Sequence, residues 1–175
     1  MVFAGFMMVE RFGFHVHELT GLYLVNLALN TLLGPVFGKA VAYFGERNTL
    51  ILEYFGLALV FLAYGGVYLF SWGAILASAL FVIDHLFFSF AFALKTYFQK
   101  IADPADIAPT AAVAFTINHI AAVGLPLGMG LVWLVSPGLV FVMAAMMAAI
   151  SLGLAFLIPR NPLPGYETIF TGRYS

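Results

Sequence analysis

The chain has 175 residues, of which 63% are hydrophobic and only 9% are charged, and its mean hydropathy is +1.04. A soluble domain is about half apolar and about a quarter charged, and a soluble chain of this size cannot hide so much apolar surface. The composition therefore excludes an ordinary soluble domain and predicts an integral membrane protein. The absence of cysteine excludes disulfides and thiolate sites, and a net charge of −1 with no basic block predicts no nucleic-acid partner.

The first apolar stretch, 1–9, is too short to cross a bilayer, because nine helical residues rise about 14 Å, roughly half of the hydrocarbon core. No basic segment precedes it and no small-residue cleavage site follows, so the pattern is not that of a signal peptide. We expect it to be the end of a spanning helix whose beginning is missing. The alternative is a short interfacial helix.

Longer apolar runs follow, and each is long enough to span a membrane as a helix. The predicted spans are 19–42, 50–70, 74–98, 110–135 and 139–158. They are separated by a polar stretch at 43–49, a tight turn at 71–73, a loop with two prolines and two acids at 99–109, and a second tight turn at 136–138. We therefore expect an all-α membrane protein, a helical bundle over 1–158 of about five full transmembrane helices plus a truncated N-terminal helix, followed by a tail over 159–175.

The lysines and arginines are divided unevenly between the two ends of these spans. Arg11 alone lies near the end that holds the two tight turns. The other six lie near the 43–49 stretch, the 99–109 loop and the tail: Lys39, Arg47, Lys95, Lys100, Arg160 and Arg173. Because cytoplasmic loops carry the excess of Lys and Arg, this bias predicts a cytoplasmic C-terminus.

A glycine-rich pattern surrounds the first polar stretch. It contains Gly38, Lys39, Phe44, Gly45 and Arg47. At these positions the segment 34–48 resembles the cytoplasmic loop motif of the major facilitator superfamily, which runs roughly glycine, basic, apolar, small, Asp, basic, aromatic, glycine, arginine, basic. Ala42 stands where the family has its acid, Tyr43 replaces a basic residue and Glu46 replaces an arginine, as in the decayed second copy of this motif.

The resemblance implies a fold and a function. The order of spans and turns after the motif is similar to helices nine to twelve, which makes 19–42 helix eight and 1–9 the end of helix seven. Segments 95–104 and 115–120 also resemble uncharacterised bacterial members. The resemblance thus implies the C-terminal half of a secondary transporter of a small solute, in the bacterial inner membrane. Its partner would be the missing N-terminal half or a second copy of the chain, with alternating access between the two halves.

Asp84 is the sharpest candidate for function, because it lies near the middle of an apolar span, where ionisable groups are costly and usually functional. A proton-coupling carboxyl and a structural Asp paired with a neighbouring helix are the two interpretations. His119 suits proton handling because histidine titrates near neutral pH. Its depth and that of Asp84 agree within about two helical turns, so the two could face each other on adjacent antiparallel helices.

Further polar residues inside the spans are candidates for a solute or proton pathway. Asn118 precedes His119, and Asn26 and Asn30 share a helix face because they are four residues apart. The alternative for these groups is a hydrogen bond between helices. His85 follows Asp84 directly and is interpreted as a packing residue, and Glu53 as an acid reaching the membrane interface.

Three functional hypotheses remain. The first is the transporter half, with proton coupling through Asp84 and His119. The second is a half-length subunit that assembles with a partner or with itself without independent transport. The third is a membrane cytochrome with His85 and His119 as haem ligands, which Phe87 and Phe88 disfavour by crowding His85. The sequence shows no nucleophile–base set, phosphate loop or metal-ligand cluster, so we expect no enzyme activity, no cofactor and no metal.

Overall fold

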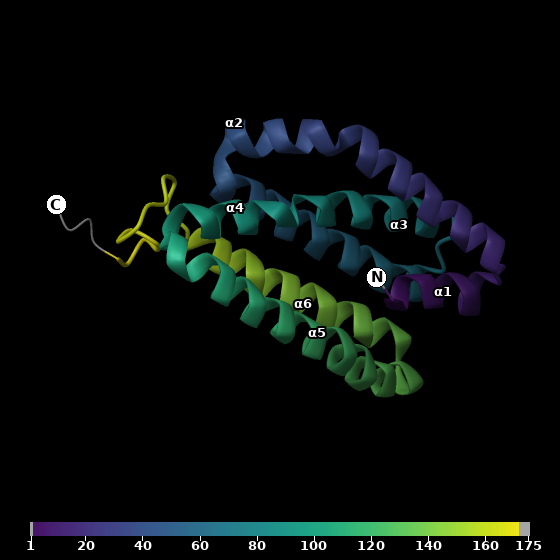
Figure 1. Cartoon of the computed structure of the whole chain (residues 1–175). Helices are drawn as coiled ribbons and strands as arrows, with labels where there is room; N and C mark the ends of the chain where they lie inside the picture. The colour runs from purple at the N-terminus through teal and green to yellow at the C-terminus, as the bar shows by residue number, and fades with distance from the viewer. Residues whose placement is uncertain (1, 172–175) are drawn as a thin grey trace.

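The computed structural model describes residues 2–171, so Met1, Arg173 and the end of the predicted tail lie outside the described part. Within it the chain is helical and contains no strand; the tail has one isolated bridge between Leu163 and Tyr166. The elements are α1 (Val2–Phe12), α2 (Val16–Phe70), α3 (Ala74–Phe88), the 3-10 helix η1 (Ser89–Ala91), α4 (Phe92–Ile101), α5 (Pro104–Val135) and α6 (Pro137–Phe156) (Figure 1).

Helix α2 reverses its direction at Gly45. The φ and ψ angles of this glycine are 79° and 161°. This conformation is not helical, and residues other than glycine rarely adopt it. Two arms result, one on each side of Gly45, and they run back along each other (Figure 1). The arms contain the predicted spans 19–42 and 50–70, and the stretch expected between them as a loop is helical except at this one residue.

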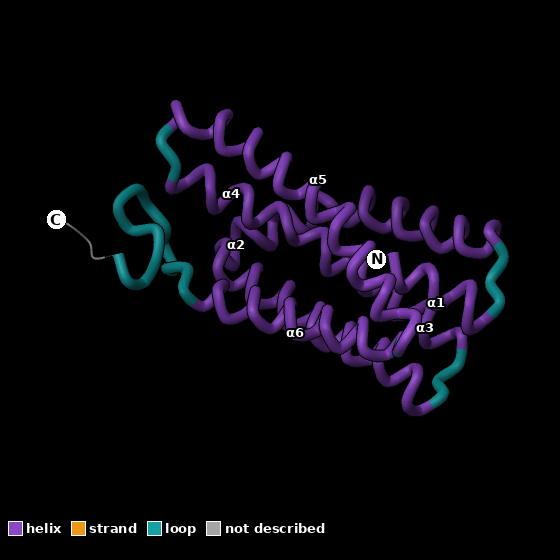
Figure 2. Tube along the Cα trace, turned by 90° about the horizontal axis from the view of Figure 1, so that it is seen from below, coloured by secondary structure: helices purple, strands orange, loops and turns teal. Residues whose placement is uncertain are grey.

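The expectation of an all-helical chain with long apolar helices is confirmed. In the described residues, four helices are long and apolar enough to cross a membrane: α2, the continuous run Ala74–Ile101 through α3, η1 and α4, then α5 and α6. The helices lie roughly along one another (Figure 2). Large apolar side chains are exposed along most of them, as lipid contact would require.

Two predicted boundaries are wrong. The loop expected over 99–109 shrinks to 102–103, because Asp103 caps α5 by accepting a hydrogen bond from the Ala105 backbone amide at 2.8 Å. Pro104 then occupies the first helical turn, where its missing amide hydrogen costs nothing. Likewise α6 begins at Pro137, directly after Ser136, so the predicted turn 136–138 is shorter.

The buried apolar side chains form two clusters at opposite ends of the bundle. The larger joins α1, the second arm of α2, α3, and the adjoining ends of α5 and α6, with Met7, Tyr64 and Phe81 fully buried. The smaller joins both arms of α2 to α4 and the end of α6, around Leu50 and Ala155. The two clusters fix α2, α3 and α6 against each other and leave α5 at the side.

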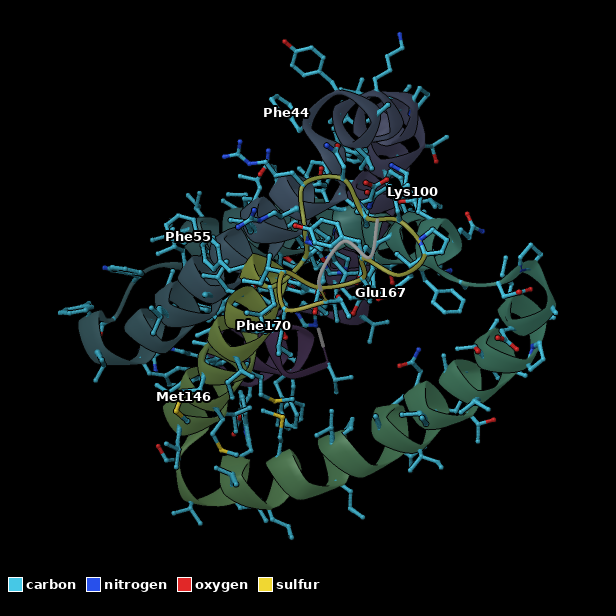
Figure 3. The ribbon with its side chains drawn as sticks, turned by 90° about the vertical axis from the view of Figure 1, so that its left-hand side faces the viewer. Phe44, Phe55, Lys100, Met146, Glu167 and Phe170 are labelled. Carbon is cyan, nitrogen blue, oxygen red and sulfur yellow. The ribbon has the colours of Figure 1, made fainter. Side chains whose placement is uncertain are left out.

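Helix α5 is the least covered of the four long helices. Only 6% of its apolar stretch is buried, and its main packing partner is α6. Figure 3 shows α5 running apart from the other helices for much of its length. Most of the surface of this helix is therefore available to lipid or to another protein.

Candidate functional site

Several polar side chains are buried among these helices without any hydrogen-bond partner in the described part of the chain. Unpartnered atoms occur on both arms of α2 and on α3: both polar atoms of Asn26, Glu53 Oε2, Tyr64 Oη, Tyr68 Oη and Asp84 Oδ2. A buried polar atom without a partner costs free energy, so native proteins keep few of them without a reason. Such groups are therefore candidates to bind a proton, an ion or a solute.

Asp84, on α3, is one of these residues. Its exposed fraction is 1%, and it interacts electrostatically with Tyr64 on the second arm of α2, which in turn interacts with Tyr23 on the first arm. Nδ1 of His85 lies 4.0 Å from Asp84 Oδ2, too far for a hydrogen bond. We use the name buried polar cluster for Asn26, Tyr64 and Asp84, which are buried on three different helical segments; among them, Tyr64 interacts electrostatically with Asp84.

His85 faces Tyr23 on the first arm of α2. Its Nδ1 is hydrogen-bonded to the Phe81 carbonyl at 2.8 Å, and its ring packs edge-on to Tyr23 at 5.7 Å between centroids. The packing interpretation made from the sequence agrees with these contacts.

Asn26 and Asn30 differ in their surroundings. Asn30 accepts a hydrogen bond from the hydroxyl of Ser89 in η1, and this bond joins the first arm of α2 to the middle of the neighbouring helical run. Asn26 is 2% exposed and its amide has no partner among residues 2–171. Asn30 therefore links two helices, whereas the buried Asn26 amide makes no such link among the described residues.

The structure does not bring His119 to Asp84, so the expected facing pair is corrected. His119 is exposed on α5, and its Nδ1 is hydrogen-bonded to the Phe115 carbonyl of its own helix at 2.9 Å. Asn118 is exposed beside it. The prediction placed α3 next to α5, but α3 packs against α2 and α1, while α5 packs mainly against α6.

The same separation bears on the haem hypothesis, which needs two histidines facing one iron. His85 is half-buried beside α2 and His119 is exposed on α5, and their Nδ1 atoms bond to different carbonyls. Among residues 2–171 there is also no group of three His, Asp or Glu side chains placed to hold a metal ion.

A second feature is a cavity of about 640 Å³ where α2 reverses, bounded by the end of α4 and the start of the tail. Three of the motif residues, Phe44, Gly45 and Arg47, line it, together with Ala42 and Tyr43. Gly38 and Lys39 do not line it; they are exposed on the preceding turns of α2. The motif thus divides into a helical part and a part that forms the reversal.

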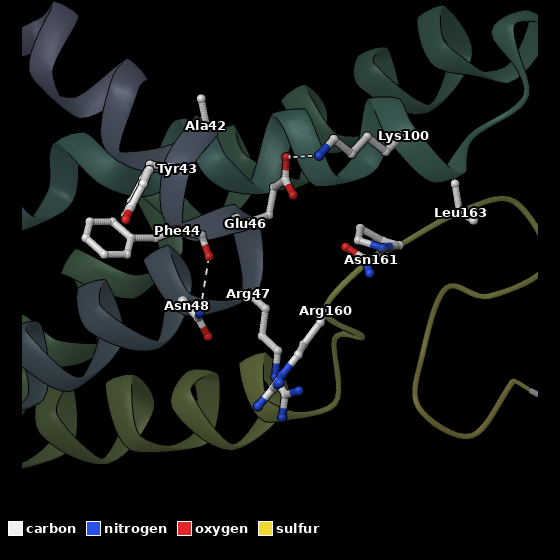
Figure 4. A pocket seen from close by; sticks show the side chains of 12 residues that line it. Ala42, Tyr43, Phe44, Glu46, Arg47, Asn48, Lys100, Arg160, Asn161 and Leu163 are labelled. Atoms are coloured by element: carbon white, nitrogen blue, oxygen red, sulfur yellow. Dashed lines mark hydrogen bonds and ion pairs between the residues drawn. The ribbon is translucent and has the colours of Figure 1, made fainter.

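The charges around this cavity are unbalanced. Nζ of Lys100 lies 2.7 Å from the buried carboxylate of Glu46, so these two charges pair. Arg47 and Arg160 also line the cavity, and their side chains converge in Figure 4. Nη2 of Arg47 donates to the Phe156 carbonyl at 3.2 Å, whereas Arg160 makes no ion pair with any described residue.

Sequence reasoning missed Tyr64, and it placed Glu53 at the interface although its exposed fraction is 1%. A tyrosine inside an apolar span is itself a signal, because its hydroxyl needs a partner once buried. Arg160 was counted only toward the charge bias. Its place beside Arg47 depends on how the tail returns to α2, which no local pattern specifies.

Comparisons with protein-family models, with curated proteins and with solved structures found no match to this chain.

Proposed function

We propose that this chain is an integral membrane protein of the bacterial inner membrane, with its C-terminus in the cytoplasm, and that it forms half of a secondary transporter for a small solute. The four long apolar helices and their exposed apolar side chains support membrane insertion. The excess of lysine and arginine at one end supports the orientation. The resemblance of the segment 34–48 to the loop motif supports the comparison with the major facilitator superfamily.

The buried polar cluster is the observation that carries the transport proposal. Asp84 is buried near the middle of a 28-residue apolar run, and Asn26 and Tyr64 are buried on the two arms of α2. Intramembrane acids in such positions commonly carry protons or contact substrates. In the proposed mechanism Asp84 binds a proton and releases it when the helices around it rearrange, while Asn26 and Tyr64 offer hydrogen-bonding groups to the proton or the solute.

The test uses membrane vesicles from cells that overproduce the full chain, in which a partner half from the host is also retained. An internal pH-sensitive dye reports proton flux when amino acids, sugars or organic cations are added outside. We expect at least one solute class to produce flux that vesicles without the chain lack. Asp84→Asn should abolish this flux, because the amide cannot release a proton.

The control for this experiment is Asp106→Asn, which makes the same chemical change at an exposed position in the first turn of α5. Flux should survive in this variant. Equal flux in the Asp84→Asn variant and the unchanged protein would contradict the proton-coupling role, and the absence of any solute-dependent flux would contradict the transport proposal itself.

The exposure of α5 favours a second candidate, a subunit that assembles with another copy of the chain. Gly124 and Gly128 are exposed on α5, and a Cβ added at either would meet no atom within 4 Å, so a second helix could approach closely there. Light scattering corrected for detergent should then give twice the 19.0 kDa mass of the chain. Gly124→Leu should reduce this to a single chain, whereas Gly153→Leu on α6 should not.

A further inference from the structure

We propose that the cavity at the reversal of α2 binds a phosphate oxyanion between the guanidinium groups of Arg47 and Arg160. This site is separate from the buried polar cluster, and it depends on membrane insertion but not on transport.

The first argument is the charge of the cavity. Its charged lining residues among those described are three cations and one carboxylate. Lys100 neutralises Glu46 directly, so the two guanidinium groups remain without a carboxylate. Both arginines also line the adjoining cavity of about 260 Å³, which confirms that they border a common space. Two like charges facing one space repel each other, and an anion between them would turn that repulsion into attraction.

The second argument is the geometry of the donors. One amino group of Arg47 is held by the Phe156 carbonyl, which fixes the side chain and leaves its other N–H groups free to face the cavity. Arg160 follows the end of α6, and Asn161 beside it adds an amide to the lining. The planar guanidinium fork matches the oxygens of a phosphate and binds them through charge-assisted hydrogen bonds.

The third argument is position. The cavity lies where the two arms of α2 meet (Figure 4). The reversal of α2 and the ends of α4 and α6 lie at one end of the membrane-length helices (Figure 1). In an inserted protein this is the depth of the lipid headgroups, whose phosphates lie at the edge of the hydrocarbon core. The oxyanion therefore has two sources, a lipid phosphodiester and a free phosphate in the cytoplasm.

The experiment measures thermal unfolding of the full purified chain in a neutral detergent, followed by tryptophan fluorescence. One titration compares inorganic phosphate with sodium chloride at equal ionic strength. The other compares phosphatidylglycerol with galactosyldiacylglycerol, a lipid without phosphate. A ligand that binds the folded state raises the unfolding temperature in proportion to the logarithm of its concentration, so each titration gives an affinity.

We expect stabilisation in at least one of the two titrations. Arg160→Gln should weaken that affinity about tenfold, because it removes one charged hydrogen-bonding group. Arg160 makes no hydrogen bond or ion pair with the described residues, so its variant should fold. Arg47→Gln should weaken the affinity equally if it folds. Lys39→Gln is the control, because it removes a cation from the same end of the protein without touching the cavity.

Stabilisation by inorganic phosphate identifies a free anion as a ligand, and stabilisation by phosphatidylglycerol alone identifies a lipid headgroup; both support the site. An equal loss of affinity in Lys39→Gln and Arg160→Gln would show general charge attraction and overturn the proposal. The absence of stabilisation in both titrations would overturn the proposal as well.

Discussion

Nε1 of Trp133 donates a hydrogen bond to Oε2 of Glu10 at 2.8 Å, which joins the end of α5 to α1 across 123 residues of sequence. The indole is buried and its ring stacks on Phe3 at 5.5 Å between centroids. This hydrogen bond and the ring contact connect α1 to the otherwise exposed α5. A tryptophan near the end of a span is often an interfacial anchor, but here it is part of the larger buried cluster.

The first prediction concerns this hydrogen bond. Trp133→Phe removes the donor and keeps an aromatic ring, and we expect it to destabilise the folded protein by about 1 kcal/mol. Glu10→Ala should have a similar effect, and the double variant should be little worse than either single one, because both remove the same interaction. Thermal unfolding in detergent measures all three, and additive losses would show that the two residues act independently.

The second prediction compares two glycines of the loop motif. Gly45 has a φ of 79°, whereas Gly38 is helical, and a Cβ added at either position would meet no atom within 4 Å. Only the backbone conformation therefore differs. Gly45→Ala should destabilise the protein by about 1–3 kcal/mol, because alanine is strained in this region of φ and ψ. Gly38→Ala should instead stabilise it by about 0.5–1 kcal/mol, since alanine is the better helix former.

Unfolding temperatures of the two variants under identical detergent conditions check this prediction directly. Equal effects of the two substitutions would mean that the chain does not reverse sharply at Gly45. The result also distinguishes a prediction based on the backbone conformation from one based on the family motif. The motif contains both glycines and gives no reason for their substitutions to differ in effect.

The third prediction concerns the ion pair between Glu46 and Lys100. Glu46 is buried, while the lysine side chain is about half exposed. Lys100→Gln leaves a buried carboxylate without its cation, and we expect a loss of about 1 kcal/mol, limited by the solvent around the lysine. Adding Glu46→Gln should recover part of the loss in unfolding temperature. A double variant less stable than Lys100→Gln would contradict this account.

The long helices were predictable because their signal is the length of the apolar runs, which does not depend on tertiary contacts. The helix boundaries near Asp103 and Pro104 were not, because proline breaks a helix in its interior but is favoured in the first turn. The sequence alone does not say which of the two applies. The cap formed by Asp103 decides it in the structure.

The candidate site was predictable in part. Asp84 stands out in any hydropathy plot, because a carboxyl in an apolar run needs an explanation. Its neighbours were not predictable, because they depend on which helices pack together. Depth along the span suggested His119, but α3 packs on α2, and Tyr64 of α2 is a residue that interacts electrostatically with Asp84.

The fourth prediction tests the orientation, and the lack of cysteine in the chain makes it simple. Ser71→Cys places a thiol in the exposed turn between α2 and α3, and Asn161→Cys places one in the tail beyond α6. The charge bias puts the first outside the cell and the second in the cytoplasm. A membrane-impermeant maleimide should therefore label Ser71→Cys in intact cells, with the outer membrane permeabilised where there is one. Asn161→Cys should react only after the inner membrane is opened. The reverse pattern would invert the proposed topology, and labelling of both sites in intact cells would contradict a spanning bundle altogether.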